Sequence, residues 1–403
     1  MKLTFFSNYL NHHQLPFCFE MVKLLGDGFR FVASTPFNQT RSQLGYADMN
    51  MAYDFVVRSY EDKTQYAIAM ELAVSSDVMI FGSTPEVFFY QRILKNPKGL
   101  TLRYSERLYK DFEGRINYRN VFFYWSFLIN RLTSRKNLLL LAASAYAPYD
   151  YVRSGFCKER IYKWGYFPDS SCYPVGRLME KKIGRIRLIW VGRLIDWKHP
   201  AHAIEVAHLL QKEQIDFELE MIGTGPMLDD ILNLVKEYQL QENVICTGGL
   251  PADKVREEME KSHIHLFTSD YNEGWGAVLN ESMASACVPV CSVAVGAAPF
   301  LIEHGKNGFV YNVNDISGMY CYVKRLAEDP VLLRNAQINA YQQIRNHWNA
   351  QIAAKNLMAL CESFLSGEEN KTVSYGPCSR AEYIKQNDMY EYMLTRKENG
   401  IIE

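Results

Sequence analysis

The sequence has little proline, no long apolar run and no excess of charge of either sign. Only 14 of its 403 residues are prolines, and 44 lysines and arginines balance 45 aspartates and glutamates, for a formal charge of −1. With 48% hydrophobic residues, the chain is neither disordered nor collagen-like. The near-neutral charge argues against a protein that coats nucleic acid, because such domains carry a strong basic excess. The most apolar stretches, residues 121–129 and 138–146, are far shorter than the ~20 residues that span a bilayer.

The sequence also lacks a cysteine framework and a targeting segment. Its nine cysteines are an odd number without a Cys-x-x-Cys pair, and Cys287 and Cys291 have no second pair with which to hold zinc. We therefore expect reduced thiols in a cytoplasmic protein, no metal site, and these two cysteines as buried packing residues. The apolar start of the chain is interrupted from Asn8 onward, too early for a signal peptide.

Short apolar runs alternate with longer amphipathic segments along most of the chain. Leu3–Ser7 is followed by the expected helix Leu15–Leu25, and Ile186–Val191 by the expected helix Pro200–Glu213. This alternation predicts parallel sheets with helices on both faces, and hence the α/β class. The expected strands are residues 3–7, 29–33, 77–82, 100–104 and 138–144 in a first series and 186–191, 217–222, 243–247, 264–268, 288–292 and 309–311 in a second.

The composition between the two series predicts the domain boundaries. A joint with prolines, serines and glycines at residues 168–182 separates them. We expect an N-terminal Rossmann-like domain over residues 1–175, a C-terminal Rossmann-like domain over 183–365, and a helical tail over 366–403 that packs back on the N-terminal domain. The amphipathic segment Ser379–Lys397 is the expected helix of that tail.

The most specific pattern is Glu273-Gly-Trp-Gly-Ala-Val-Leu-Asn-Glu281, which follows an expected strand and runs into a helix. Its glycines allow the backbone to approach a ligand closely, and the free N–H groups of the next turn form an anion site. Two glutamates beside that site suit a ligand with both phosphates and hydroxyl groups, because carboxylates accept hydrogen bonds from sugar hydroxyls. The other expected contacts of this segment are Gly274, Gly276, Ala277 and Val278.

A second pattern, Gly192-Arg-Leu-Ile-Asp-Trp-Lys198, directly follows the strand that ends at Val191. Arg193 offers a planar fork and Lys198 a point charge, a pair well suited to a diphosphate. Both lie at the carboxyl end of a strand, where open α/β sheets bind ligands. The alternative is that they are surface ion-pairing residues, which contribute little to stability.

These two patterns resemble the G-R-L-x-x-x-K and E-x7-E elements of retaining glycosyltransferases of family 4. Gly223–Pro226 resembles the family's G-x-G-P turn, and Gly305–Gly308 resembles its G-x-N-G turn. The similarity extends over residues 186–360 and is weaker over residues 1–180. It implies the GT-B architecture, in which two Rossmann-like domains face an interdomain cleft, the first for the acceptor and the second for the nucleotide-sugar donor.

The resemblance implies a role for each matching residue. Arg193 and Lys198 would bind the donor's pyrophosphate, Glu281 the ribose hydroxyls and Glu273 the transferred hexose, which makes Glu273, Arg193 and Lys198 the expected catalytic residues. The amides after Gly276 would stabilise charge on the leaving diphosphate, and neither a metal ion nor another cofactor is required. The remaining expected donor contacts are Gly192, Gly223, Gly225, Thr247, Gly248 and Leu250, the last three at the backbone that faces the base.

Two positions of the second half depart from the family pattern. His199 follows Lys198 where the family usually has glycine, and Phe300 stands where the family commonly has glutamate.

The first half offers five candidate residues for the acceptor side of the cleft. The loop after the first strand carries Asn8, His12 and His13 where the family has a glycine-rich loop. Glu106 and Arg107 stand where the family often has a histidine near the acceptor. The two histidines are either cleft contacts or solvated loop residues, and Glu106 and Arg107 either contact the acceptor or a phosphate or form a structural ion pair.

Residues 87–138 combine basic with aromatic residues. Eleven lysines and arginines there oppose three acidic residues, a local charge of +8 in a nearly neutral chain. Such a surface suits nucleic acid or anionic lipid headgroups, and the alternative is a solvated basic face over a Phe-rich core. Because the resemblance favours a lipid-linked acceptor, we expect an anionic membrane surface as partner and no nucleic acid. The basic residues are Arg92, Lys95, Lys98, Arg103, Arg107, Lys110, Arg115, Arg119, Arg131, Arg135 and Lys136.

The sequence therefore predicts a retaining glycosyltransferase. It would transfer a hexose from a nucleoside diphosphate, with UDP-sugars as the leading hypothesis, to a polysaccharide, glycolipid or lipid-linked acceptor, forming an alpha-glycosidic bond. Its expected role is in bacterial surface polysaccharide assembly, such as capsule or lipopolysaccharide, at the inner face of the cytoplasmic membrane. Two alternatives share the fold: a non-catalytic scaffold that binds nucleotide sugars, and a nucleotide-sugar epimerase.

Overall fold

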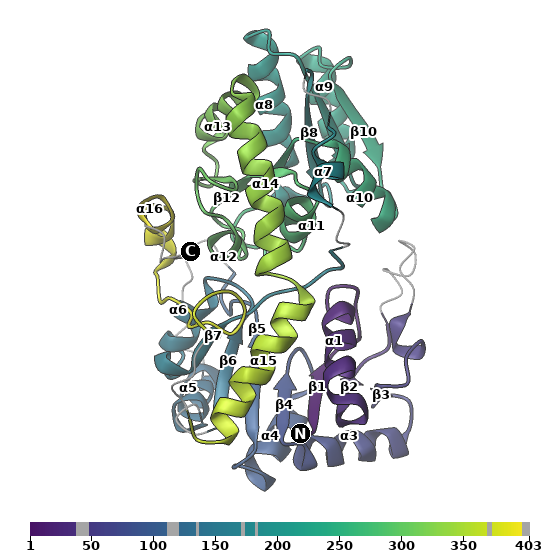
Figure 1. Cartoon of the computed structure of the whole chain (residues 1–403), viewed down its shortest axis with the longest axis vertical. Helices are drawn as coiled ribbons and strands as arrows, with labels where there is room; N and C mark the ends of the chain where they lie inside the picture. Colours follow the sequence, from purple (N-terminus) through teal and green to yellow (C-terminus); the bar gives the residue numbers. More distant parts are fainter. Residues whose placement is uncertain are drawn as a thin grey trace. The chain divides into compact units, whose positions relative to one another are not determined.

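A computed structural model of the chain describes residues 1–37, 48–110, 121–133, 137–170, 174–181, 184–368 and 373–396, with only the backbone described for residues 121–126. The chain divides into two compact α/β units, and Figure 1 traces both. The first unit contains the described parts of residues 1–109, 113–169 and 347–383. The second contains those of residues 110–112, 170–346 and 384–403.

Sheet A, in the first unit, is a seven-stranded sheet in the order β3-β2-β1-β4-β5-β6-β7. All its pairings are parallel. Strand β1, between β2 and β4, is buried at every residue, and its mostly apolar sequence LTFFS is typical of a parallel strand covered on both faces. The strands are β1 (Leu3–Ser7), β2 (Phe29–Ala33), β3 (Val56–Arg58), β4 (Val78–Phe81), β5 (Leu100–Ser105), β6 (Leu138–Ala142) and β7 (Ile161–Lys163).

Helices of the first unit cover sheet A and close its core. One core cluster joins strand residues such as Phe6 and Leu140 to Phe88 and Phe89 of α4, with Ile129 of α5 packed against it. Helix α15 packs against α1, although the two are more than 300 residues apart in sequence. The helices are α1 (Leu15–Leu25), α3 (Lys63–Ser75), α4 (Glu86–Lys95), α5 (Val121–Thr133), α6 (Ala147–Arg153) and α15 (Ala350–Leu365).

Sheet B, in the second unit, has six parallel strands in the order β10-β9-β8-β11-β12-β13. The strands are β8 (Ile186–Val191), β9 (Phe217–Ile222), β10 (Val244–Gly248), β11 (Ile264–Phe267), β12 (Val288–Ser292) and β13 (Phe309–Tyr311). The helices are α7 (Val175–Leu178), α8 (Pro200–Lys212), α9 (Leu228–Glu237), α10 (Ala252–Lys261), α11 (Val278–Ala284), α12 (Ala298–Leu301), α13 (Ile316–Glu328), α14 (Pro330–Asn346) and α16 (Met389–Thr395).

The predicted α/β class and all eleven expected strands are confirmed, six of them with the bounds that the sequence indicated on both ends. Cys287 and Cys291 are fully buried, as expected. Two strands of only three residues, β3 and β7, were not expected. No helix in the described ranges is long and apolar enough to cross a membrane.

The C-terminal part of the chain differs from the expected organisation. Residues 347–383, which include α15, group with the first unit, and the described residues after Tyr383 group with the second. Ser379–Lys397 is not one helix: residues 378–381 pair with the edge strand β7, through Lys163 N–H to the Ser379 carbonyl (2.8 Å) and Ala381 N–H to the Ile161 carbonyl (3.1 Å). An edge strand presents free backbone groups, which here prevail over the amphipathic pattern. The helix is confined to α16.

Candidate functional site

The strand order of each sheet indicates where a ligand binds. In sheet B, β8 is followed in the chain by its neighbour β9 on one side, and β11 lies on its other side. At such a switch point, the loops after the two central strands diverge and leave a crevice at the carboxyl ends of the strands. The loops concerned are residues 192–199, after β8, and residues 268–277, after β11. These are the two segments in which the sequence predicted the diphosphate and hexose contacts.

Lys198 and Glu273, 75 residues apart in the sequence, form an ion pair between these two loops. The Nζ of Lys198 lies 2.7 Å from Oε2 of Glu273, and each side chain is 13% exposed. Lys198 also lies over the ring of Trp197, 4.7 Å from its centroid. The structure therefore brings together two of the three predicted catalytic residues. Arg193, the third, is exposed, with its guanidinium 5.9 Å from the centroid of the Trp197 ring.

Residues that the sequence analysis missed hold this ion pair in place. The Ser269 hydroxyl donates to Oε2 of Glu273 at 2.9 Å. The Thr268 hydroxyl donates to the Lys198 carbonyl at 2.5 Å and accepts from the Trp190 indole N–H at 2.8 Å. Thr268 and Ser269 directly follow β11 at its carboxyl end, and that position was the signal that could have identified them.

The predicted glycines allow neighbouring loops to make backbone contact. A side chain at Gly223, whose φ is +150°, would collide with the Gly192 carbonyl, and one at Gly225 would collide with the Leu194 carbonyl. The Gly223 N–H donates to the Gly248 carbonyl at 2.8 Å. Gly192, Gly223 and Gly248 thus meet at the ends of β8, β9 and β10, where the Gly223 backbone lies too close to Gly192 for a side chain.

Helix α11 begins directly after the glycines of the Glu273 segment. Gly274 is buried, and Gly276 has a φ of +84° with the place of its missing Cβ 2.7 Å from Val295 Cγ1. Ala277 is the N-cap residue and Val278 the first residue of the helix, so their N–H groups belong to the turn that lacks intrahelical acceptors. The expected anion-binding amides therefore stand at a helix N-terminus.

Glu281 lies one turn into α11. Burial raises the pKa of its carboxyl to about 7, and the charge of Arg256 opposes that rise. At neutral pH this carboxyl is therefore partly protonated. Its ionised form accepts hydrogen bonds from hydroxyl groups, and its protonated form can also donate one.

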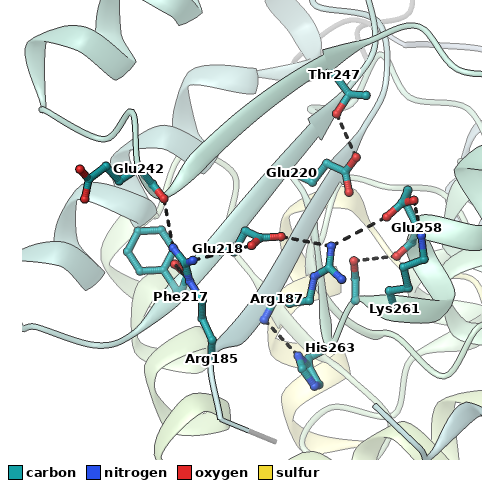
Figure 2. Close-up of polar contacts among 11 residues, drawn as sticks. Arg185, Arg187, Phe217, Glu218, Glu220, Glu242, Thr247, Glu258, Lys261 and His263 are labelled. Atoms are coloured by element: carbon teal, nitrogen blue, oxygen red, sulfur yellow. Dashed lines mark hydrogen bonds and ion pairs between the residues drawn. The ribbon is translucent and has the colours of Figure 1, made fainter. Parts of the chain in front are cut away.

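Leu250 and Thr247 lie at the end of β10. Leu250 packs against a cluster that contains Ile189 and Ile222, and Val278, at the start of α11, packs against the same cluster. The Thr247 hydroxyl is directed at Glu220, to which it donates at 2.9 Å (Figure 2). The side chain of Thr247 is thus hydrogen-bonded to Glu220 of β9, so the expected contact with a nucleotide base would have to come from the backbone at this position.

His199, at the glycine position of the family pattern, adopts a left-handed conformation with φ +44° and ψ +54°. Its Nε2 lies 3.5 Å from Oδ2 of Asp270, and its ring stacks on His202 at 4.8 Å between centroids. Burial, and secondarily the charge of His199, lowers the pKa of His202 to about 4. The backbone conformation explains why glycine is common here, since a side chain is strained at positive φ.

In the first unit, Tyr166 connects two of the predicted acceptor-side residues. Its hydroxyl donates to Oε1 of Glu106 at 2.6 Å, and its ring stacks on His13 at 5.4 Å between centroids. The ring of His12 lies against that of His13. The loop after β1 borders the switch point of sheet A, between β1 and β4. The sequence did not indicate Tyr166 as a site residue, because it follows the short strand β7, which was itself not predicted.

Arg107 and Asn8 have structural contacts. Arg107 is 5% exposed and pairs with Asp150, Nε to Oδ2 at 3.5 Å, which matches the structural ion pair that the sequence left open. Burial raises the pKa of Asp150 and the charge of Arg107 lowers it. The Asn8 side chain accepts from the Tyr9 N–H at 2.8 Å, and its carbonyl accepts from the Thr35 N–H at 2.8 Å.

The basic segment 87–138 is only partly a surface. Arg92 is fully buried, and its guanidinium donates to the carbonyls of Ser76, Asp77 and Leu100. Arg103 pairs with Glu86 at 3.2 Å. Together with Arg107, three of the eleven basic residues therefore serve the fold rather than a solvated face. Lys95, Lys98, Lys110 and Arg131 are exposed, and Arg115, Arg119, Arg135 and Lys136 lie outside the described residues.

With this geometry in view, comparisons with known proteins identify the second unit. Residues 180–343 match the family model described as "Glycosyl transferases group 1". The chain carries a glycosyltransferase group 1 domain. This domain contains every residue that was predicted to contact the donor, from Gly192 to Glu281.

Curated relatives are similar over the same part of the chain. N-acetyl-alpha-D-glucosaminyl L-malate synthase from Bacillus anthracis is 34% identical over 137 residues, 33% of this chain and 35% of the relative. The putative colanic acid biosynthesis glycosyltransferase WcaL from Salmonella typhimurium is 27% identical over 187 residues, 44% of this chain and 45% of the relative. The chain thus spans less than half the length of these curated relatives.

Solved structures are similar over nearly the whole chain. Anabaena HepE in complex with UDP aligns with a TM-score of 0.66 and 14% identity, over 90% of this chain and all of the other. The apo form of the lipopolysaccharide outer core galactosyltransferase WaaB aligns with a TM-score of 0.61 and 14% identity, over 91% of this chain. At such identities the likeness establishes the fold, which is the GT-B architecture of two parallel-sheet α/β domains.

Proposed function

We propose that this chain is a retaining glycosyltransferase that moves a hexose from a nucleoside diphosphate donor, with UDP favoured, to a polysaccharide, glycolipid or lipid-linked acceptor. The observation that carries the proposal is the Lys198–Glu273 pair, which joins the two loops of the switch point in sheet B. The ammonium of Lys198 can bind phosphate, and the carboxylate of Glu273 can accept from sugar hydroxyls. The neighbouring glycines allow a ligand to approach the backbone closely.

The charges at the site fit a donor with two phosphates. The Lys198 ammonium has three N–H groups, so it can contact a phosphate oxygen while it pairs with Glu273. Both contacts to the Glu273 carboxylate, from Lys198 and Ser269, fall on Oε2, so Oε1 can accept from a hexose hydroxyl. Arg193 is exposed and can reach the diphosphate with its planar fork.

The proposed reaction breaks the bond between the anomeric carbon and the diphosphate oxygen. A bond forms from that carbon to the acceptor hydroxyl oxygen on the same face, and the hydroxyl proton passes to the leaving diphosphate. Negative charge on the diphosphate grows in the transition state. In this proposal Arg193, Lys198 and the first-turn amides of α11 stabilise that charge, as preorganised dipoles and charges do in transfer enzymes. Under this proposal no metal ion is needed.

The comparisons support the donor and acceptor classes. Anabaena HepE is described in complex with UDP and glucose. A relative from Campylobacter jejuni, 30% identical over 145 residues, is named as a 4-alpha-N-acetylgalactosaminyltransferase that acts on a diphospho-undecaprenol substrate. WcaL is named for colanic acid biosynthesis.

A donor screen tests the proposal. Purified protein is incubated with UDP-, GDP- and ADP-sugars, and nucleoside diphosphate release is followed by mass spectrometry. We expect slow release from one donor class, lost in Lys198→Ala and retained in Lys254→Ala, a surface lysine whose partner is Glu257. Isomerised nucleotide sugars would favour the epimerase instead. Nucleotide binding without any release, in the presence of extracts containing lipid-linked acceptors, would favour the scaffold.

The outer surfaces of α4 and α5 favour a membrane as the place of the acceptor. Val87, Tyr90 and Leu94 are exposed at i, i+3 and i+7 of α4, and Leu94 is 76% exposed. Leu128 and Leu132 are exposed on α5. Lys95, Lys98 and Arg131 are exposed on or just after these helices. Apolar side chains beside cations suit the headgroup region of an anionic bilayer.

Vesicle flotation tests this surface. The protein should float with phosphatidylglycerol-containing vesicles and be released by high salt, because salt screens the cations. The double variant Leu94→Ser, Leu132→Ser should stay in the bottom fraction. Leu232→Ser, which changes an exposed leucine of α9 in the second unit, should float like the wild type. Equal flotation of all three proteins would exclude this surface.

A further inference from the structure

Lys181 is a half-buried cation held by the carboxyl ends of two helices. It lies in the segment that leads into β8, and its Nζ donates to three backbone carbonyls: Ser262 at 2.6 Å, Ser285 at 2.9 Å and Ala286 at 2.8 Å. Ser262 is the C-cap of α10, and Ser285 is the C-cap of α11. A cation at a helix C-terminus is favourable, because the last carbonyls lack intrahelical donors and carry partial negative charge.

Removing the Lys181 ammonium from water costs free energy, and its hydrogen bonds to the three carbonyls offset that cost. Burial lowers the pKa of its ammonium to about 8, while the charge of Glu260 opposes that change. All three N–H groups of the ammonium are used by the three carbonyls, which is the full donor capacity of a lysine. The ammonium is therefore fixed to the backbone of two helices, although its side chain is only half-buried.

The residues just before Lys181 hold the same turn. Leu178, at the end of α7, is 2% exposed and packs on Ala286 and Tyr341. The Arg334 guanidinium donates to the Met179 carbonyl. Ala286 itself has a positive φ of +52°. Segment 175–181 therefore fastens the turn after α11 by an apolar contact and by the ammonium together.

A short chain of hydrogen bonds leads from Lys181 to Glu281. Lys181 donates to the carbonyl of Ser285, and the N–H and the hydroxyl of Ser285 both donate to the Glu281 carbonyl, at 3.1 and 2.8 Å. Helix α11 has only seven residues, so its C-terminal and N-terminal turns cannot move independently. Its N-terminal turn supplies the amides of Ala277 and Val278.

We propose that Lys181 is a positioning residue for the nucleotide, which fixes α11 from behind so that Glu281 and the first-turn amides point at the donor. This inference rests on the proposed function. It adds a residue that lies outside both sequence motifs and that touches no part of the donor. Its effect should appear in donor affinity, through the angle and rigidity of α11.

Calorimetry with UDP and hydrogen exchange test the inference on the full chain. Lys181→Met keeps the length of the side chain and removes the ammonium, and we expect its Kd for UDP to rise about tenfold. Exchange should accelerate in residues 281–287 but not in α13. Lys181→Arg retains the charge and should recover most of the affinity. Lys261→Met is the matched control, because Lys261 is an exposed lysine on α10 that pairs with Glu258; it should bind like the wild type.

Unchanged UDP affinity in a folded Lys181→Met would overturn the inference and leave the proposed function intact. Absence of UDP, GDP and ADP binding in the wild type would overturn the proposed function and the inference with it. If Lys181→Met does not fold, the wild type decides by reciprocity: saturating UDP should slow exchange in residues 174–181 as well as in α11. Protection of α11 alone would then overturn the inference.

Discussion

Two ion pairs between distant residues, one in each unit, differ in how completely the protein closes around them. In the first unit, Arg107 and Asp150 have side chains 2% and 1% exposed, and Asp150 also accepts from the N–H groups of Leu108 and Tyr109. In the second unit, the side chains of Lys198 and Glu273 are each 13% exposed, in loops at the carboxyl ends of the central strands of sheet B.

The difference separates a structural pair from a ligand-binding pair. Asp150 is buried and accepts from two backbone N–H groups beside the guanidinium of Arg107, so removing it leaves a buried arginine without its anion. Glu273 and Lys198 keep hydrogen-bonding capacity and solvent contact, so the same kind of pair can receive a sugar diphosphate. Sequence proximity to a motif does not distinguish the two cases, but burial does.

The largest expected effect is on activity at the open pair. Glu273→Gln keeps the size of the side chain but removes the charge, so donor turnover should fall at least about 10³-fold. The free energy of unfolding in urea should change by less than about 1 kcal/mol, because solvent still reaches Lys198. A destabilisation as large as that of the Asp150 variant below would instead make this pair structural.

The closed pair should show the opposite profile. Asp150→Ala should lower the free energy of unfolding by about 3 kcal/mol, because it strands the buried guanidinium of Arg107. Activity per folded molecule should stay near that of the wild type. Glu86→Ala is the control, since its pair with Arg103 is half exposed and is worth at most about 1 kcal/mol. If Asp150→Ala folds but no longer binds acceptor, Arg107 would instead be a residue of the acceptor site.

Glu281 extends the comparison to a carboxyl whose burial raises its pKa to about 7. Folding then disfavours the ionised form, so wild-type stability should fall as pH rises from about 4.5 to 7 and stay lower above that. Glu281→Gln lacks this loss and should be more stable than the wild type by about 1–2 kcal/mol at pH 8, with little difference near pH 4.5. Thermal unfolding at the two pH values measures it, with exposed Glu237→Gln as the control. A pH-independent difference would contradict this account.

The smallest effect concerns the loop that carries Lys198. His199→Gly should raise stability by about 0.5 kcal/mol, because relief of the positive φ outweighs the flexibility that glycine adds to the unfolded chain. Gln214→Gly, at φ +57° after α8, gives the same relief away from the site. If His199→Gly weakens UDP binding more than about threefold while Gln214→Gly does not, the contact of His199 with Asp270 is part of the open site.

The strands were the most predictable part of the fold. Runs such as Leu3–Ser7 and Ile186–Val191 are mostly apolar and mostly buried, and such runs mark the covered strands of a parallel sheet. Strands β3 and β7 are three residues long and each ends in a basic residue, so they lack the continuous apolar run that marks the equally short β13. Segment 378–381 has an amphipathic sequence, yet its backbone pairs with the edge of sheet A, and that partner lies more than 200 residues away.

The positions of site residues could be predicted where a single short motif contains both the residue and the backbone that determines its position. Gly192, Gly223 and Gly248 meet because each ends a strand of one sheet, which local sequence reveals. Lys181 could not be found in this way, because its three acceptors belong to the ends of two helices formed later in the chain. The charge of Arg92 suggested a surface, but its donors are used by carbonyls inside the first unit.

The sequence by itself determined the α/β class, the two series of strands and the motifs from Gly192 to Glu281, because these depend on the order and spacing of neighbouring residues. Only the tertiary structure decided which charged groups face a ligand and which serve the fold. Lys198 and Glu273 remain partly open, whereas Arg92 and Arg107 are enclosed. Burial sets that difference, since it depends on segments that are far apart in the chain and adjacent only after folding.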